Sequence, residues 1–208
     1  MAGKREIIVY IATSADGYIA RPDGDVGWLN RPRIPGDYGM GLFMKSIDTI
    51  LWGRKTYDMA LGFGEKGGSY GKGIRSYVFT RRKPMSPSPW ATFVDEPIGA
   101  FAKRLRRSRG KRIWMMGGAE IIGSFLDEGE IDRFIIHVIP VLIGEGIPLL
   151  SPRHREVPLE LLSTKRFQDG VVRLDYSVSR RRGMRPRRGK LTGLRPRPAP
   201  DAGERIEP

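Results

Sequence analysis

Three places in the chain combine residue types that bind phosphate groups. At the first, Gly53 ends the apolar run TILWG, and Arg54, Lys55 and Thr56 would form the first turn of the next helix. Cations at a helix N-terminus are repelled by the positive end of the helix dipole, so they do not stabilise the helix. They are well placed if a phosphate group binds there, because the free N–H groups and the cations would converge on it. An exposed basic turn is the alternative, and this stretch alone does not decide between the two.

The second place is IWMMGGAEII, in which an apolar run leads through Gly117 and Gly118 into a helical pattern. A glycine pair is often only a tight turn. It also permits close approach to the backbone, which the pyrophosphate of a dinucleotide needs together with a helix N-terminus. The spacing is not G-x-G-x-x-G, so this is not the standard dinucleotide fingerprint.

The third place is VFTRRK, where Thr80 precedes Arg81, Arg82 and Lys83. Taken alone, this stretch fits a solvated loop. Neighbouring parallel strands end at one edge of a sheet, which is where ligands bind. Two strand ends that each combine a hydroxyl with cations therefore strengthen the phosphate hypothesis.

The long segment 11–29 is predicted to be a lid over a flat ring. It is spaced by glycines and carries Tyr18, Ile19 and Trp28 beside the end of a strand. Apolar side chains in such a loop are typical of a lid, although a plain loop with two Asp-Gly turns is the alternative. Asp16 is expected to be a turn residue rather than an acid catalyst.

The elements that must position these residues alternate between strands and helices. Apolar runs predict strands, and residues at spacings of three and four predict helices. The expected strands are 6–14, 49–53, 76–80, 91–94, 112–116 and 133–143, the expected helices are 41–48, 96–110 and 119–129, and 159–179 is expected to form a hairpin turning at Asp169-Gly170. The pattern predicts an α/β three-layer sandwich: a mixed, mostly parallel sheet with helices on both faces and a C-terminal antiparallel hairpin.

Composition narrows the function further. The 208 residues suit one domain, predicted at 1–179, followed by a basic Arg/Pro/Gly-rich tail at 180–208 that is expected to be disordered. There are no cysteines and only two histidines, so thiol chemistry is excluded and no metal site is predicted. No signal peptide or membrane span is recognised, and a cytoplasmic protein is expected. The net charge of +14 indicates an anionic partner.

Five motifs, taken in order, resemble the dihydrofolate-reductase-like superfamily. Within that superfamily, the closer likeness is to the C-terminal reductase domain of the bacterial bifunctional deaminase-reductase of riboflavin biosynthesis and to its small stand-alone relatives. The resemblance covers residues 5–179, and its motifs are SADGYIA, DTILWGRKTY, YVFTRR, IWMMGGAEIIGSFL and IHVIPVLIGEGIPLL. It implies an NADPH-dependent reductase that transfers a hydride to a small heterocyclic or ribose-derived substrate.

The resemblance also implies where NADPH would bind, along the carboxyl edge of the sheet. Two arginines at one strand end favour NADPH over NADH, because they can bind the 2′-phosphate. The implied contacts are Ala12 and Ile19 at the nicotinamide, Gly53, Arg54, Lys55 and Thr56 on the pyrophosphate and adenosine side, Thr80, Arg81 and Arg82 at the 2′-phosphate, and Gly117, Gly118, Ala119, Glu120 and Ile121 beneath the nicotinamide and pyrophosphate.

The substrate side is less specified. Asp37 falls near the position of the carboxylate that holds the pterin in classical dihydrofolate reductases, although PGDYGMG is a poor helix sequence. The substrate-side residues are expected to be Ser14, Trp28 and Tyr57, and the proton would come from solvent or from Asp37. A folate, a pyrimidine-ribose phosphate and a third heterocycle all remain open.

Two other classes of protein stay open as well. One is a nucleic-acid-binding protein that acts through the tail and the basic run 103–112, and the other is a nucleotide-binding domain without catalysis. The resemblance makes a homodimer through the late strands an expectation, and the run FIIHVIPVLI fits either a buried strand or a dimer seam. His137, within that run, is expected to be a core or interface histidine.

Overall fold

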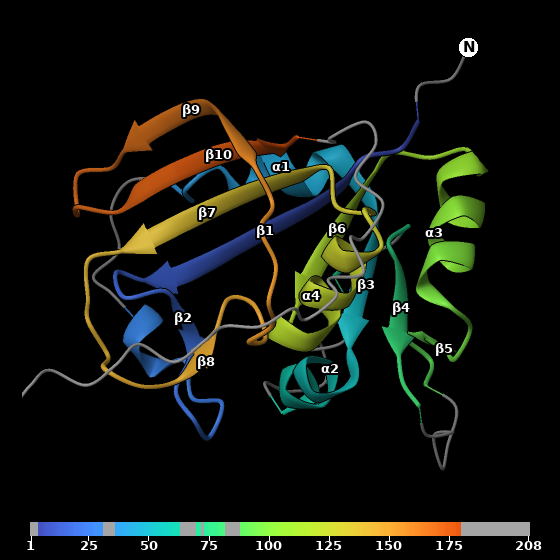
Figure 1. The fold of residues 1–208 in the computed structure, drawn as a ribbon, viewed down its shortest axis with the longest axis horizontal. Helices are drawn as coiled ribbons and strands as arrows, with labels where there is room; N and C mark the ends of the chain where they lie inside the picture. The colour runs from blue at the N-terminus through green and yellow to red at the C-terminus, as the bar shows by residue number, and fades with distance from the viewer. Residues whose placement is uncertain (1–3, 31–35, 63–69, 72, 82–87, 180–208) are drawn as a thin grey trace, which may run out of the picture.

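A computed structural model describes residues 4–30, 36–62, 70–71, 73–81 and 88–179 (Figure 1). Its main feature is an eight-stranded sheet in the order β5-β4-β3-β6-β1-β7-β10-β9. The prediction of a mixed, mostly parallel α/β sheet is confirmed. The predicted tail 180–208 and the predicted site residue Arg82 lie outside the described residues.

Six strands form the parallel part of the sheet. Strand β1 lies between two parallel neighbours, and its residues Ile7, Ile8 and Val9 are completely buried. Burial on both faces explains why this strand is a continuous apolar run instead of an alternating pattern. The parallel strands are β1 (Ile7–Ser14), β3 (Ile47–Gly53), β4 (Arg75–Phe79), β5 (Thr92–Val94), β6 (Arg112–Gly117) and β7 (Arg133–Ile139).

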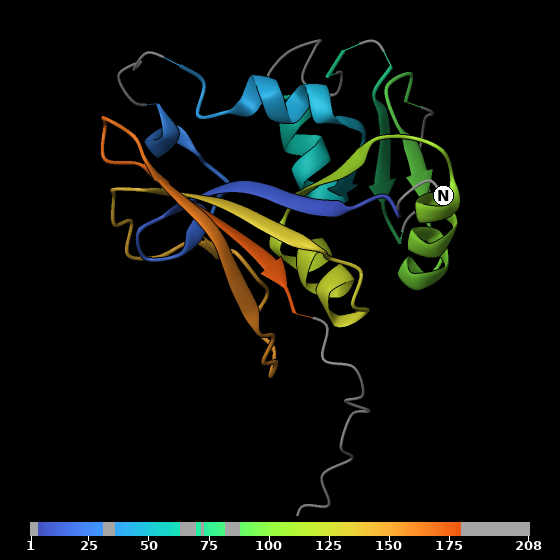
Figure 2. The same ribbon diagram turned by 90° about the horizontal axis from the view of Figure 1, so that it is seen from above.

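Helices cover both faces of this sheet (Figure 2). Helices α1 (Met40–Ser46) and α2 (Arg54–Leu61) pack on one face, where Phe43 and Tyr57 join a core with Trp52. Helices α3 (Ile98–Arg107) and α4 (Ala119–Asp127) pack on the other face through Phe101 and Phe125. The two apolar cores give the three layers that the sequence predicts.

The described part of the chain ends in the predicted antiparallel hairpin. Strand β10 (Val172–Val178) pairs with β7, and β9 (Leu159–Arg166) pairs with β10 at the edge of the sheet. Asp169 and Gly170 lie between them, and the positive φ of Gly170 fits the turn. Strand β7 therefore lies inside the sheet, so residues 134–139 of FIIHVIPVLI form an interior strand, while residues 140–143 follow it outside the strand and expose Leu142. The homodimer itself stays a prediction.

Strand β7 is shorter than the expected 133–143. It ends at Ile139, just before Pro140, which has no N–H to donate to a neighbouring strand. The chain then forms β8 (Ile147–Pro148), which pairs with β2 (Tyr18–Ala20) in a separate small sheet. The expected lid segment is thus attached to the loop that follows β7.

The basic run 103–112 is only partly a solvated face. Arg106 is buried and donates hydrogen bonds to Glu130 Oε2 at 2.9 Å and to the Arg5 carbonyl at 2.7 Å. Burial of a charge is tolerated when it is paired and hydrogen-bonded in this way. Arg106 therefore belongs to the structural end of the sheet, opposite the carboxyl ends of the parallel strands. Among the described residues, no helix is long and apolar enough to span a membrane.

Candidate cofactor and substrate site

The strand-to-helix junctions after β3 and β6 contact each other directly. A Cβ atom placed on Gly53 would lie 3.2 Å from Ile121 Cγ2, 3.4 Å from the Gly117 carbonyl oxygen and 3.5 Å from the Gly118 nitrogen. These distances are at or below ordinary van der Waals contact, so only glycine fits at position 53 without movement. The structure thus brings together four of the predicted cofactor residues.

Gly117, the last residue of β6, and Gly118, which follows it, are needed for different reasons. Gly117 has a φ of +119°, which L side chains rarely adopt. Gly118 has an ordinary extended backbone, with φ of −81°, but a Cβ atom there would lie 3.0 Å from Thr56 Oγ1 and 4.0 Å from Ile19 Cδ1. The peptide bond between the two glycines is cis. The side chains of Thr56 and Ile19 therefore approach the backbone of Gly118 closely.

Two helices begin at this surface without a capping side chain. Helix α2 starts at Arg54 after Gly53, helix α4 starts at Ala119 after Gly118, and neither helix has a side-chain hydrogen bond at its N-cap. The first N–H groups of a helix have no partner within the helix. Both starts can therefore donate to a phosphate group.

The predicted cations at these helix starts have neighbours of their own. The Arg54 guanidinium donates to Asp58 Oδ1 at 2.8 Å, one turn along α2, and lies 5.4 Å from the centre of the Phe93 ring. Lys55 Nζ lies 3.7 Å from Glu120 Oε1, and both side chains are exposed. The Lys55–Glu120 ion pair thus links the start of α2 to the start of α4. The Arg54 side chain instead pairs with Asp58 of the same helix.

The third predicted phosphate contact lies at the next strand end. Phe79 of β4 is in register with Gly53 of β3, so Thr80 and Arg81 follow directly beside the first junction. The Thr80 N–H donates to the Val94 carbonyl at 3.0 Å, and Arg81 is exposed. Arg81 is therefore free to reach a ligand along the carboxyl edge of the sheet.

The loop after β1 is held by local hydrogen bonds. Ser14 Oγ accepts from the Tyr18 N–H at 3.0 Å, and Asp16 accepts from the N–H groups of Ile143 at 3.1 Å and Gly144 at 2.8 Å. A hydrogen bond with Ser14 and these backbone N–H groups lower the pKa of Asp16. Asp16 is therefore a structural loop residue, as expected. Ser14 is almost fully buried, so its hydroxyl serves the loop and is not exposed to a substrate.

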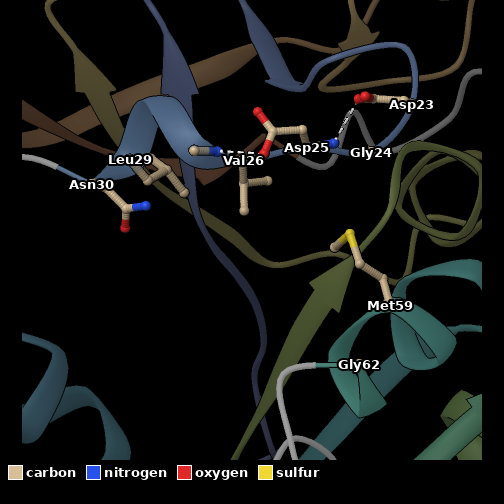
Figure 3. A pocket seen from close by; sticks show the side chains of 9 residues that line it. Asp23, Gly24, Asp25, Val26, Leu29, Asn30, Met59 and Gly62 are labelled. Carbon is tan, nitrogen blue, oxygen red and sulfur yellow. Dashed lines mark hydrogen bonds between the residues drawn. The ribbon is translucent and has the colours of Figure 1, made fainter.

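A groove of about 680 Å³ separates the second part of this loop from α2 (Figure 3). Loop residues 23–27, 29 and 30 form one wall, and Met59 and Gly62, at the end of α2, form the other. Trp28, in the short helix η1 (Gly27–Leu29), is half-buried, and its indole N–H has no hydrogen-bond partner among the described residues. The groove is thus an opening beside the predicted lid.

Tyr57 does not face this groove. Its side chain is 1% exposed, its hydroxyl shares a 2.7 Å hydrogen bond with Ser88 Oγ, and its ring packs edge-on against Trp52 and Phe93. The expected substrate contact at Tyr57 is corrected accordingly: this side chain belongs to the core beneath α2. An aromatic residue on the inner side of a helix is buried by the packing of that helix.

Asp37 has a structural role that the sequence did not suggest. Its carboxylate accepts from the N–H groups of Gly39 at 2.9 Å and Gly41 at 2.6 Å, at the start of α1. The Gly41 and Gly39 N–H groups lower the pKa of Asp37, whereas a proton donor needs a raised pKa. Asp37 therefore caps the start of α1, and the glycines beside it leave room for the cap, while its role as an acid stays a prediction.

Sequence reasoning missed a polar cluster next to Asp37. The Tyr10 hydroxyl donates to the Tyr38 carbonyl at 3.1 Å, and His137 Nε2 lies 3.2 Å from the same oxygen. The Tyr38 hydroxyl donates to Asp169 Oδ2 at 2.6 Å, and Tyr38 has a left-handed φ of 55°. These contacts tie the segment before α1 to β1, β7 and the hairpin turn. His137 is a buried histidine, as expected.

Burial sets the charge of this cluster. It raises the pKa of Tyr10 to about 12, and it lowers the pKa of His137 below its usual value. Both groups are therefore neutral near pH 7. The backbone carbonyls of Tyr38 and Ile11 act in the opposite direction and raise the pKa of His137, but each by less than burial lowers it.

Comparison with known proteins agrees with this architecture. The model of the RibD C-terminal domain family matches residues 98–173. A protein of known structure from Shewanella sp. PV-4, whose name assigns it provisionally to riboflavin biosynthesis, has 26% sequence identity and a TM-score of 0.75, covering 84% of this chain and 99% of that one. A bifunctional deaminase/5-amino-6-(5-phosphoribosylamino)uracil reductase from Thermotoga maritima has the same fold at 16% identity, with a TM-score of 0.63, covering 85% of this chain and 57% of that protein.

Two proteins of Bacillus subtilis strain 168 are similar over nearly their whole length. The uncharacterised protein YwjB is 39% identical over 168 residues, which cover 81% of this chain and 95% of YwjB. The uncharacterised protein YyaP is 32% identical over 182 residues, which cover 83% of this chain and 95% of YyaP. With the family model and the shared fold, these matches show that the chain belongs to the RibD C-terminal domain family.

Proposed function

We propose that the protein is an NADPH-dependent reductase that transfers a hydride to a small heterocyclic or ribose-derived substrate. The observation that carries this proposal is the backbone surface formed by Gly53, Gly117 and Gly118 between two uncapped helix starts. Membership of the RibD C-terminal domain family supports it. A 5-amino-6-(5-phosphoribosylamino)uracil reductase is the preferred activity, and dihydrofolate reduction is the second candidate.

The residues at the carboxyl edge fit a dinucleotide. Close approach at Gly53 and Gly118 would place a pyrophosphate within reach of the N–H groups that begin α2 and α4. Arg81, exposed beside the first junction, would bind a 2′-phosphate with a charge-assisted hydrogen bond. NADPH, when bound, supplies the hydride, and the protein supplies its alignment.

The substrate would enter through the groove between loop residues 23–30 and α2. The loop that carries Trp28 would then exclude water from the hydride-transfer position. Asp37 and Asp16 both hold backbone N–H groups, and hydrogen bonding lowers the pKa of each. The proton in this proposal therefore comes from solvent.

The decisive test is the preference for NADPH over NADH. Binding is measured by quenching of tryptophan fluorescence in the native protein and in the double variant Arg81→Ala/Arg82→Ala. We expect NADPH affinity to fall roughly tenfold or more, because a charge-assisted contact to the 2′-phosphate is lost, and NADH affinity to stay nearly constant.

The matched control is Arg107→Ala/Arg109→Ala, which removes the same charge from exposed positions at the end of α3. An unchanged NADPH preference in the Arg81/Arg82 variant would show that the 2′-phosphate assignment is wrong. Turnover is followed at the nicotinamide absorbance band with the phosphoribosylaminouracil and with dihydrofolate. NADPH binding without turnover of either would favour a non-catalytic nucleotide-binding domain.

A further inference from the structure

A row of four residues crosses the sheet from the predicted nicotinamide position to its edge. Ala12 of β1 is in register with His137 of β7, His137 with Arg173 of β10, and Arg173 with Lys165 of β9. Residues directly opposite each other in a sheet project from the same face. The row lies near the carboxyl ends of β1 and β7, on the left of the sheet in Figure 1, and on the face that α1 and α2 cover.

Arg173 has no counter-charge in this row. Its Nε atom is buried without a hydrogen-bond partner among the described residues, and no carboxylate of those residues forms an ion pair with it. Its Nη1 atom would lie 3.4 Å from a Cβ atom on Gly39, so the guanidinium packs against the backbone before α1. Partial burial of an unpaired guanidinium is costly, which is typical of a cation that awaits a ligand.

The neighbouring carboxylates are engaged elsewhere. Asp37 accepts the N–H groups at the start of α1, and Asp169 accepts the Tyr38 hydroxyl. Asp175, two residues along β10, is paired with Arg133 through two hydrogen bonds of 2.6 Å. The same strand therefore supplies a bidentate partner for Arg133 and none for Arg173.

The other members of the row leave its positive charge in place. His137 is neutral, because burial lowers its pKa and the charge of Arg173 acts in the same direction. Tyr10, which also lies close to Arg173, is neutral because burial raises its pKa. Lys165 is exposed, and its Nζ atom lies 5.0 Å from the centre of the Phe167 ring. Two cations thus lie side by side at the edge of the sheet.

We propose that Arg173, with Lys165 beside it, binds an anionic group of the substrate, either a phosphate or a carboxylate. Two strand spacings, about 10 Å, separate Ala12 from Arg173 along the row. The substrate would be a heterocycle whose anionic group is held about that far from the carbon that accepts the hydride. The position of the hydride rests on the proposed function, whereas the anion site at Arg173 does not.

The test uses the full chain and two probes, inorganic phosphate and glutarate. Binding is followed through the Nε–H resonance of Arg173 in proton–nitrogen spectra, assigned from its disappearance in Arg173→Lys. We expect saturable shifts of this resonance at millimolar probe concentrations. Probe affinity, followed in all proteins by the backbone amide of Gly39, should fall about tenfold or more in Arg173→Gln and less in Arg173→Lys and Lys165→Gln.

The matched control is Arg107→Gln, which makes the same charge change on an exposed turn of α3 and should bind both probes as the native protein does. The tighter of the two probes identifies the anion as phosphate or carboxylate. No saturable shift in the native protein, or equal affinity in Arg173→Gln with a folded spectrum, would overturn the proposal.

The titration is repeated in the presence of saturating NADPH, so that the probes cannot bind where the phosphate groups of NADPH bind. If NADPH fails to bind, the proposed function is wrong, yet Arg173-dependent anion binding can still be measured in the free protein. If NADPH binds and the Arg173 resonance does not respond to either probe, the anion site is wrong while the proposed function stands.

Discussion

The two halves of the candidate site are built in different ways. In the cofactor half, the junctions after β3 and β6 present backbone, and the important feature of Gly53 and Gly118 is the side chain that they lack. In the substrate half, side chains from β1, β7 and the hairpin turn hold the segment before α1 through Tyr38. The cofactor half consists of local motifs, whereas the substrate half depends on long-range contacts.

The difference between the halves suits different ligands. The backbone surface suits a cofactor that is the same in related proteins, and the side-chain surface suits a substrate that differs between them. A surface of backbone and helix starts recognises a phosphate chain whatever lies beyond it. A surface of side chains changes its chemistry with each substitution. Within one fold, we therefore expect cofactor recognition to be set by the glycines and substrate choice to be set by residues such as Arg173.

The largest expected effect that tests this contrast is that of Gly118→Val. The new side chain starts 3.0 Å from Thr56 Oγ1 and fills the position of close approach, so NADPH binding should fall by roughly a hundredfold or more. Calorimetric titration measures the affinity, and circular dichroism reports the fold. The backbone at Gly118 is extended, so a side chain there is not strained by its φ.

The double variant Gly118→Ala/Thr56→Ala is the control for contact within the protein. It relieves the crowding at Thr56 and keeps a methyl group at the ligand surface. Normal NADPH affinity in Gly118→Val would show that Gly117 and Gly118 form only a turn.

An intermediate effect should separate the capping role of Asp37 from an acid role. Asparagine caps a helix about as well as aspartate but cannot donate a carboxyl proton. In Asp37→Asn, we expect kcat to stay within about twofold of the native value, and in Asp37→Ala we expect a lower melting temperature. A large loss of kcat in Asp37→Asn, with an unchanged melting temperature, would return Asp37 to catalysis.

The smallest expected effect is a pH dependence of stability from His137. Burial depresses its pKa in the folded protein below the usual value of 6.5, so the unfolded chain binds the proton more readily. The contribution of His137 is therefore present above about pH 6.5 and is lost as the pH falls through the folded pKa. The melting temperature should drop by roughly a few degrees between pH 7.5 and pH 5.5.

The variant His137→Gln should lose this part of the pH dependence, while its hydrogen bond to the Tyr38 carbonyl can be retained. The His137 ring resonances should titrate below pH 6.5. Titration at or above the ordinary histidine pKa would show that the substrate half is more open to water than its burial indicates.

The two glycine junctions after β3 and β6 could largely be predicted from the sequence. The apolar runs before Gly53 and Gly117 predict strands, the residues after them predict helices, and parallel strands end at one edge. The structure places Gly53, Thr56, Gly117 and Gly118 in contact, as that reasoning requires. Arg54 was less predictable, since its pairing with Asp58 depends on its rotamer and on the nearby Phe93.

The substrate half could not be predicted in the same way. Asp37 was assigned by its distance from a motif along the chain, but its orientation is decided by the N–H groups of Gly39 and Gly41. Tyr57 lies on a helix whose inner face is known only once α2 packs on the sheet. For both Asp37 and Tyr57, the residue type was compatible with a place in the substrate site. The contacts in the folded protein instead give each side chain a structural role.

The sequence by itself determined the buried parallel strands and the glycine junctions, because apolar runs and turn residues act within a few positions of each other. It also determined the C-terminal hairpin through Asp169 and Gly170. Only the tertiary structure decided that Ala12, His137, Arg173 and Lys165 form one row. Strand order and register select such neighbours, and a shift of one residue would turn these side chains to the other face.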